Sequence, residues 1–271
     1  MNSLSEQDAE FAREQLAAGC KTMERMLHGL LDSKGRIAEE VHAIRKLGKS
    51  LRGGFALFRL QISAAREVQA IGRLLSEPRD AVSRLNTWHK LEWEGDASAA
   101  ILGLLEQQTH SAARRPPEAT VEWCAARMTE AAKKLLEQPT TDLAEQATLG
   151  LKNLHKQLAK RCRRLDHRGE EDFHDARKAL KAYLGAISYL PEGLITLDPK
   201  MTELAELLGD ENDLATLSAW IEGHGFTQHF EPYLWVKVTE RRLKLQKKAI
   251  RDAAQMVIGN VGAGTKLNKN G

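Results

Sequence analysis

Apolar residues recur every three or four positions along most of this chain, which is the spacing of amphipathic α-helices. In the first segment, Ser5 stands three residues before Asp8, a pairing that caps helix N-termini. We therefore expect a helix from Ser5 to about Leu31. Its predicted buried face consists of Phe11, Leu16, Cys20, Met23, Leu27 and Leu30.

The same periodicity continues beyond this first segment. It predicts a second long helix from about residue 36 to residue 62 or beyond, two shorter helices near 65–75 and 79–91, a further segment near 97–113, and a helix near 118–137. No segment shows convincing alternation of apolar and polar residues, and good helix formers dominate the composition. The chain is therefore predicted to be all-α.

A glycine pair lies inside the second long helix. Gly53 and Gly54 both lower the stability of a helix that contains them. We interpret the pair as the point at which a neighbouring helix approaches closely. The residues that this helix is expected to bury are Val41, Ile44, Leu51, Phe55 and Phe58.

A charged pattern occurs twice in the chain. Residues 40–49 and 172–181 each contain an acid and an apolar residue followed by His-x-x-Arg-Lys-x-x-Lys, so that His42 corresponds to His174. Positions i, i+3, i+4 and i+7 share one face of a helix. Each copy therefore presents one imidazole and three cations along a stripe. Such cations repel one another unless an anion lies over them, so the stripes predict a polyanion receptor.

Three further pairs of segments match in the same order along the two halves of the chain. The sequence distance between the two members is similar in the first pairs and smaller in the last pair. The first half therefore contains about 20 additional residues, most simply near 92–116. The matching pairs of segments are 20–27 with 151–158, 74–80 with 207–213, and 127–130 with 237–240.

This order predicts a duplicated domain. A first helical repeat is expected over residues 1–138, including the insertion, and a second over residues 139–258, followed by a disordered tail over residues 259–271. The two repeats should form pseudo-symmetric helical bundles, packed as one body around a basic central cavity.

The stripes and the helices that precede them supply the candidate binding residues. Arginine grips phosphate oxygens bidentately and lysine acts as a movable point charge, which suits a flexible phosphate chain. The two histidines are expected to gain protons on binding, so affinity should rise as the pH falls toward 6. The predicted binding residues are Lys21, Arg25, His28, His42, Arg45, Lys46, Lys49, Arg52, Lys152, Lys156, Lys160, Arg163, His174, Arg177, Lys178 and Lys181.

Two pairs of motifs resemble the CHAD family, the conserved histidine α-helical domain, over about residues 5–255. They are Val41-His42-x-x-Arg45-Lys46-x-x-Lys49 with Arg52, Phe173-His174-x-x-Arg177-Lys178-x-x-Lys181, and the expected turns Glu77-Pro78-Arg79-Asp80 and Leu208-Gly209-Asp210-x-x-Asp213.

The resemblance implies an all-helical fold of two bundles around a basic cavity, and binding of inorganic polyphosphate. In some members it implies association with polyphosphate or polyester granules. The chain departs from the pattern at two positions: Leu184 stands where Arg52 stands in the first half, and Asn212 where Arg79 stands.

Three other readings of these residues remain open. Glu40, Asp172 and Asp175 could pair with the cations and make each stripe a solvated charged face. Glu39-x-x-His42 and Glu171-x-x-His174 have the spacing of di-iron helical bundles, although the cations on the same face disfavour a metal. Nucleic acid is a competing polyanion, although no recognition helix, zinc motif or stacking signature accompanies the stripes.

The bulk composition narrows the function further. The net charge is only +3, so the positive charge is local rather than global. The cysteines Cys20, Cys124 and Cys162 are expected to be reduced core residues, no membrane span is expected, and the predicted location is cytoplasmic. The predicted function is non-enzymatic polyphosphate binding, with no cofactor, catalytic residue or metal ligand.

Overall fold

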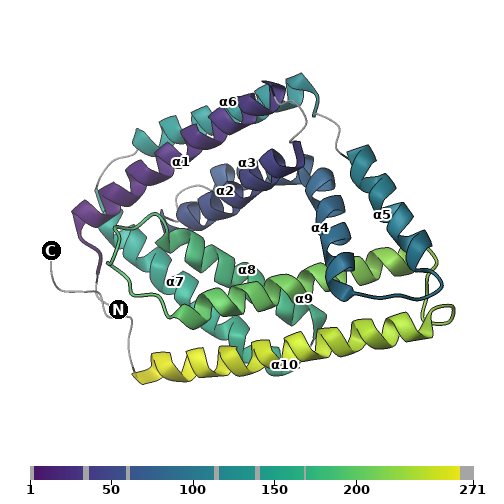
Figure 1. Ribbon diagram of the computed structural model, residues 1–271. Helices are drawn as coiled ribbons and strands as arrows, with labels where there is room; N and C mark the ends of the chain where they lie inside the picture. The colour runs from purple at the N-terminus through teal and green to yellow at the C-terminus, as the bar shows by residue number, and fades with distance from the viewer. Residues whose placement is uncertain are drawn as a thin grey trace.

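The structure is a computed structural model, and it describes residues 3–32, 37–58, 62–112, 116–137, 141–167 and 169–262. In this part of the chain, ten α-helices and one short 3-10 helix form the secondary structure, which confirms the predicted all-α class (Figure 1). None of the described helices is long and apolar enough to cross a bilayer.

The helices divide into two groups along the sequence. The first half of the chain forms α1 (Glu6–Asp32), α2 (Ile37–Phe58), α3 (Ile62–Leu74), α4 (Ser76–Leu91), α5 (Ser98–Ala112) and α6 (Glu118–Leu136). The second half forms α7 (Leu143–Arg164), the 3-10 helix η1 (Leu165–His167), α8 (Glu170–Ile187), α9 (Pro199–Gly223) and α10 (Pro232–Gly262).

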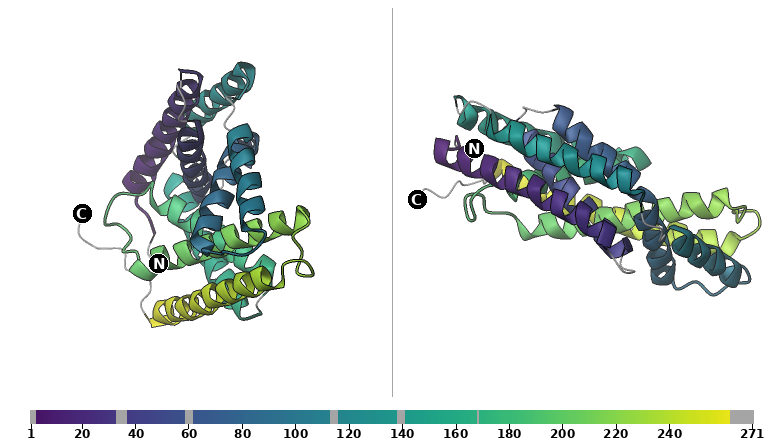
Figure 2. Two further views of the ribbon diagram at one scale, coloured as in Figure 1. Left: turned by 45° about the vertical axis from the view of Figure 1, so that its right-hand side comes forward. Right: turned by 90° about the horizontal axis from the view of Figure 1, so that it is seen from above.

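The helices pack mainly in pairs. Helix α1 packs against α6 along one side of the molecule, and α9 packs against α10 along the other (Figures 1 and 2). Helices α2, α7 and α8 contact one another between these pairs. The two helices that carry the repeated stripes, α2 and α8, are thus direct neighbours.

Glycines let these central helices approach backbone to backbone. A Cβ on Gly53 of α2 would lie 2.5 Å from the carbonyl oxygen of Ala182 in α8, and a Cβ on Gly150 of α7 would overlap the carbonyl of Leu57. Gly54 faces Leu16 and a tyrosine ring instead. The close approach predicted for the glycine pair is confirmed, and it brings the two stripes together.

Helix α1 begins as predicted. The Ser5 hydroxyl accepts a hydrogen bond from the Asp8 N–H at 3.1 Å, and the Asp8 carboxylate accepts one from the Ser5 N–H at 3.0 Å. Phe11 was expected in the core but is 39 % exposed, because the packed face of α1 is centred on neighbouring positions such as Ala12 and Leu16. That part of the prediction is wrong.

Several predicted boundaries differ from the structure. Helix α2 ends at Phe58 and α3 begins at Ile62, so no single helix is described from residue 36 to residue 62, and residues 59–61 lie outside the described part. The segments 77–80 and 208–213 were expected as turns but lie within α4 and α9. Pro78 is tolerated there because it falls in the first turn of α4.

The chain end and the cysteines can also be compared with expectation. Helix α10 extends to Gly262, so the first residues of the tail predicted from residue 259 are helical, and residues 263–271 lie outside the described part. All three cysteines are buried free thiols, as predicted, and burial raises their pKa to about 12 for Cys20, about 11 for Cys124 and about 12 for Cys162. The internal duplication stays a prediction.

Candidate functional site

Five cationic side chains gather where α2, α8 and α4 meet. Burial, followed by repulsion from neighbouring cations, lowers the pKa values of four of them, Arg45, Lys49, Arg177 and Lys181. The burial of Gly53 against α8 explains the gathering, since close helix packing leaves the long cationic side chains pointing to a shared edge. We name this the cation cluster, and its members are Arg45, Lys49, Arg79, Arg177 and Lys181.

Two aspartates partly balance the cluster. Asp80 lies 3.0 Å from Arg79 and 3.7 Å from Arg45, and Asp213 lies 3.7 Å from the other nitrogen of Arg79. Arg177, which is buried, lies near both carboxylates. The cluster therefore has five cations for two carboxylates, and Arg79 joins an aspartate of α4 to one of α9.

The excess positive charge changes the acidity of the two lysines. Burial, followed by repulsion from Lys181, Arg79, Arg177 and Arg45, lowers the pKa of Lys49 to about 7. Burial and Arg177 lower the pKa of Lys181 to about 8, against the opposing effect of Asp213. An anion close to the two ammonium groups would raise both pKa values again.

A groove opens beside the cluster, between α2, α7 and α8. It has a volume of about 570 Å³, and the described residues that line it include no carboxylate and no Phe, Tyr or Trp side chain. Asn153 and Gln157 of α7 add uncharged polar groups to its wall. We call it the basic groove, and its cationic lining consists of Lys49, Arg52, His174, Arg177, Lys178 and Lys181.

His174 is held in place at the edge of the basic groove. Its Nδ1 lies 3.0 Å from the amide oxygen of Asn212, whose nitrogen donates to Asp213 at 3.4 Å. An amide oxygen can only accept, so Nδ1 carries the proton in this contact. The other ring nitrogen, Nε2, can then donate a hydrogen bond to an anion only when the imidazole is protonated.

His42 lines a different groove. This groove has a volume of about 660 Å³, lies between α2 and α4, and is lined also by Arg79, Lys90, Glu39 and Asp213. Burial, Arg79 and the lysines and arginine of the stripe all lower the pKa of His42. The structure therefore does not bring the two imidazoles into one groove, and His42 takes up a proton only at lower pH than an ordinary histidine.

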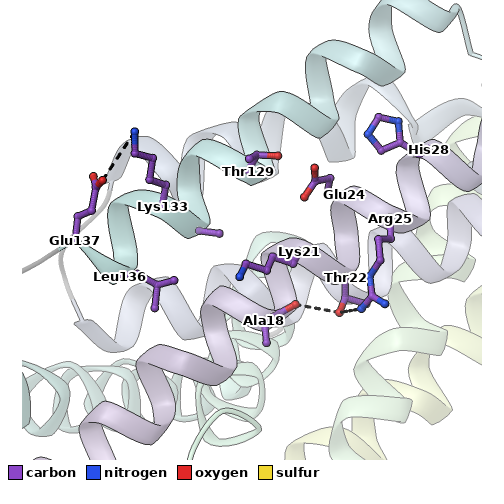
Figure 3. Close-up of a pocket in the computed structure, with 11 residues that line it drawn as sticks. Ala18, Lys21, Thr22, Glu24, Arg25, His28, Thr129, Lys133, Leu136 and Glu137 are labelled. Atoms are coloured by element: carbon purple, nitrogen blue, oxygen red, sulfur yellow. Dashed lines mark hydrogen bonds and ion pairs between the residues drawn. The ribbon is translucent and has the colours of Figure 1, made fainter.

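Helix α1 does not form a wall with the stripe of α2. Lys21, Arg25 and His28 line a groove of about 700 Å³ between α1 and α6 (Figure 3). Glu24 and Glu137 also line this groove, so its charge is mixed. The expected shared surface fails because these side chains line the groove beside α6, which is the helix against which α1 packs most closely.

The local contacts of the α1 residues fit this placement. Arg25 extends along α1 and donates to the hydroxyl of Thr22 at 3.2 Å (Figure 3). His28 lies 3.4 Å from Glu122 of α6. None of the three α1 residues lines the basic groove.

The basic residues of α7 also point elsewhere. The residues that α7 contributes to the basic groove are Gly150, Asn153, Leu154 and Gln157, and none of them is charged. Lys46 of α2 is likewise exposed and lines none of these grooves. The exposed α7 residues outside the grooves are Lys152, Lys156, Lys160 and Arg163.

Sequence reasoning missed Arg79 and Asn212 as parts of the site. Both had been noted only as members of expected turns, although their position beside Asp80 and Asp213 in a repeated segment was a usable signal. Arg79 instead contributes to the cation cluster, and Asn212 orients His174.

The metal-site alternative lacks further ligands. In the part of the chain that the structure describes, no group of three or more His, Cys, Asp or Glu side chains could hold a metal ion. Among the described residues, neither Glu-x-x-His pair therefore belongs to a group of ligands of the kind that a di-iron bundle requires.

Comparisons with known proteins show which solved structures this chain resembles. Among curated proteins, no significant match to the sequence is found. PptA from Streptomyces chartreusis has a similar structure, with a TM-score of 0.65 and 16% sequence identity over 93% of this chain and 99% of that chain. The crystal structure of the CHAD domain from the plant Ricinus communis is also similar, with a TM-score of 0.63 and 18% identity over 95% of this chain and 93% of that one.

The sequence itself agrees with this structural similarity. The family profile of the CHAD domain matches residues 12–222, which include α2, α4, α8 and nearly all of α9, with all members of the cation cluster. Because this match covers well over half of the sequence, the chain belongs to the CHAD family.

Proposed function

We propose that this protein binds inorganic polyphosphate in the basic groove and leaves the polymer chemically unchanged. The observation that carries the proposal is the unbalanced cation cluster, in which Lys49 and Lys181 are held with lowered pKa values beside three arginines. Holding partly buried cations together is unfavourable unless an anion compensates them. A chain with one negative charge on each phosphate supplies that compensation along the whole groove.

The lining of the basic groove favours polyphosphate over nucleotides and nucleic acids. Proteins that bind single-stranded nucleic acid place bases on aromatic side chains, and the groove offers no Phe, Tyr or Trp for stacking. Its polar groups are cations and two amides, which suit phosphate oxygens along a linear chain. A ligand without bases would use every favourable contact that the groove provides.

A titration of labelled long-chain polyphosphate tests the site. The double variant Arg52→Glu/Lys178→Glu reverses two exposed cations of the basic groove, and loss of two charge-assisted contacts should weaken binding by about 100-fold or more. The matched control is Lys152→Glu/Lys156→Glu, which has the same net charge but alters the outward face of α7. Equal weakening by both variants would show that only the overall charge matters.

Competition tests the ligand. At physiological salt, unlabelled polyphosphate should displace the labelled chain at much lower phosphate concentration than DNA, RNA or ATP. Equal competition by DNA would instead indicate a general polyanion surface. Incubation with polyphosphate should leave its chain length unchanged, and release of orthophosphate or shorter chains would contradict the non-enzymatic part of the proposal.

The proposal extends to cellular location. A protein that holds polyphosphate in this groove should collect where the polymer is stored, including polyphosphate granules. A fluorescent fusion should then co-localise with the polymer, whereas the fusion of Arg52→Glu/Lys178→Glu should remain diffuse.

A further inference from the structure

A second cationic groove adjoins the basic groove. It lies between α2 and α3, has a volume of about 220 Å³, and its lining contains Arg45 and Arg73 but no carboxylate. Lys49 and Arg52 line both grooves, so the two grooves adjoin at these side chains on α2. We call it the α2–α3 groove.

The walls of the α2–α3 groove are fixed by specific contacts. Arg45 donates to the carbonyl oxygen of Gly72 and lies 3.7 Å from Asp80, so its guanidinium is anchored at the edge of the groove. Ile44, Val68 and Ile71 are buried beneath it. The groove is therefore a preformed surface that a ligand can enter without rearranging the core.

Arg73 is the cation that this groove adds to the site. It is exposed near the end of α3, and in the described part of the chain it forms no ion pair. Arg45, which lines the same groove, has a buried Nε–H group without an acceptor among the described residues. Two guanidinium groups thus line a narrow groove whose described lining contains no carboxylate, and the Asp80 carboxylate lies outside it, 3.7 Å from Arg45.

We propose that a bound polyphosphate chain continues from the basic groove across α2 at Lys49 and Arg52 into the α2–α3 groove, where Arg45 and Arg73 bind further phosphates. The inference rests on the proposed function of the basic groove. A chain long enough to occupy both grooves gains contacts that a short chain lacks. The α2–α3 groove therefore makes the protein select for long polyphosphate.

Two variants test the second groove by different means. Arg73→Glu reverses the charge that only this groove contains. Gly72→Gln places an uncharged side chain in the groove, because a Cβ at Gly72 meets nothing within 4 Å, and glutamine is a better helix former than glycine. The control is Arg241→Glu, an exposed residue of α10 in a groove that shares no residue with the site.

The probes are long-chain polyphosphate and inorganic tripolyphosphate, each titrated against all variants and Arg52→Glu/Lys178→Glu. Arg73→Glu and Gly72→Gln should weaken long-chain binding about 10-fold and leave tripolyphosphate binding unchanged, and Arg73→Glu should reduce the salt slope of long-chain binding by roughly 0.7–1. Arg241→Glu should change neither affinity.

The other outcomes overturn the inference in distinguishable ways. If long-chain affinity is unchanged in Arg73→Glu and Gly72→Gln but lost in Arg52→Glu/Lys178→Glu, the chain stays in the basic groove and only the extension is wrong. If Arg73→Glu weakens the binding of both probes equally, Arg73 acts only through the overall electrostatic field of the protein and does not contact the polymer. If wild-type protein fails to bind long chains, the proposed function itself is wrong.

Discussion

Raising the pH from 6 to 9 should weaken polyphosphate binding by about 10²–10³, because Lys49 and Lys181 lose their protons in this range. In the unliganded protein the pKa values are about 7 for Lys49 and about 8 for Lys181. A bound anion favours the ammonium forms, so both pKa values rise on binding. Binding above pH 7 must therefore take protons from solution.

The magnitude follows from the protonated fractions. Between pH 6 and pH 9, deprotonation of Lys49 reduces the binding-competent fraction by about 100-fold, and that of Lys181 by about 10-fold. The product is on the order of 10³, and screening in an open groove reduces it toward 10². At pH 8 the complex should take up on the order of one proton, most of it on Lys49.

Calorimetric titrations measure both quantities. Affinity is followed across the pH range, and proton uptake is obtained from the binding enthalpy in buffers with different ionisation heats. An ordinary histidine has a pKa of about 6.5, and the pKa of His42 is lowered further, so a histidine effect begins at lower pH than the lysine effect. Constant affinity from pH 7.5 to 9, with no proton uptake at pH 8, would falsify the lysine assignment.

Lys49→Arg provides the matched variant. Arginine keeps its charge throughout this range, so the variant should lose most of the pH dependence and bind more tightly than wild type at pH 9. A pH profile identical to that of wild type would contradict the role given to Lys49.

The same lysines predict the opposite trend in stability without ligand. Their pKa values are lower in the folded protein than in the unfolded chain, so between about pH 7 and pH 10 the unfolded chain binds more protons. The contribution of both groups to the free energy of unfolding therefore rises with pH in this range. Denaturant titrations should show a smaller rise in Lys49→Met than in wild type.

Three further predictions concern the packing and charge of the site. In a denaturant titration, Gly53→Ala should lower the free energy of unfolding by about 1–3 kcal/mol or more, because its Cβ would lie 2.5 Å from the Ala182 carbonyl. In the same titration, Gly29→Ala should raise the free energy of unfolding by roughly 0.5–1 kcal/mol, because a Cβ at Gly29 meets no neighbour. Long-chain affinity should fall linearly with the logarithm of salt concentration, and Arg52→Glu/Lys178→Glu should make that slope shallower by at least roughly 1.4; an unchanged slope would contradict their contact with phosphate. Arg79→Gln removes a charge that lowers the pKa values of Lys49 and Lys181, so both pKa values should rise. The loss of affinity in the calorimetric pH profile should then move to higher pH. An unchanged profile would contradict the place of Arg79 in the cation cluster.

Much of the fold could be predicted because helical periodicity is a local property of the sequence. The capping pair at Ser5 and Asp8 gave the start of α1, and the glycine pair at Gly53 indicated a close helix contact. The repeated stripes likewise pointed to residues that meet in space, since Lys49 and Lys181 occupy the same position in each copy and lie together in the cluster.

The rest of the site depends on which helix packs where, and the spacing of residues in one helix does not determine that. Lys21 and His42 each belong to a good cationic stripe, yet α1 turns the first toward α6 and α4 covers the region beside the second. Arg73 carried no signal at all, because a single exposed arginine near a helix end is common. Only the packing of α3 on α2 places it beside Arg45.

The position of the bound polymer tests the central claim most directly. In a crystal structure of the protein with polyphosphate, we expect phosphate oxygens about 3 Å from the Nζ atoms of Lys49 and Lys181, within the basic groove between α2, α7 and α8. Phosphates bound instead in the groove between α1 and α6, or along the outward face of α7 at Lys152 and Lys156, with the basic groove empty, would contradict the account.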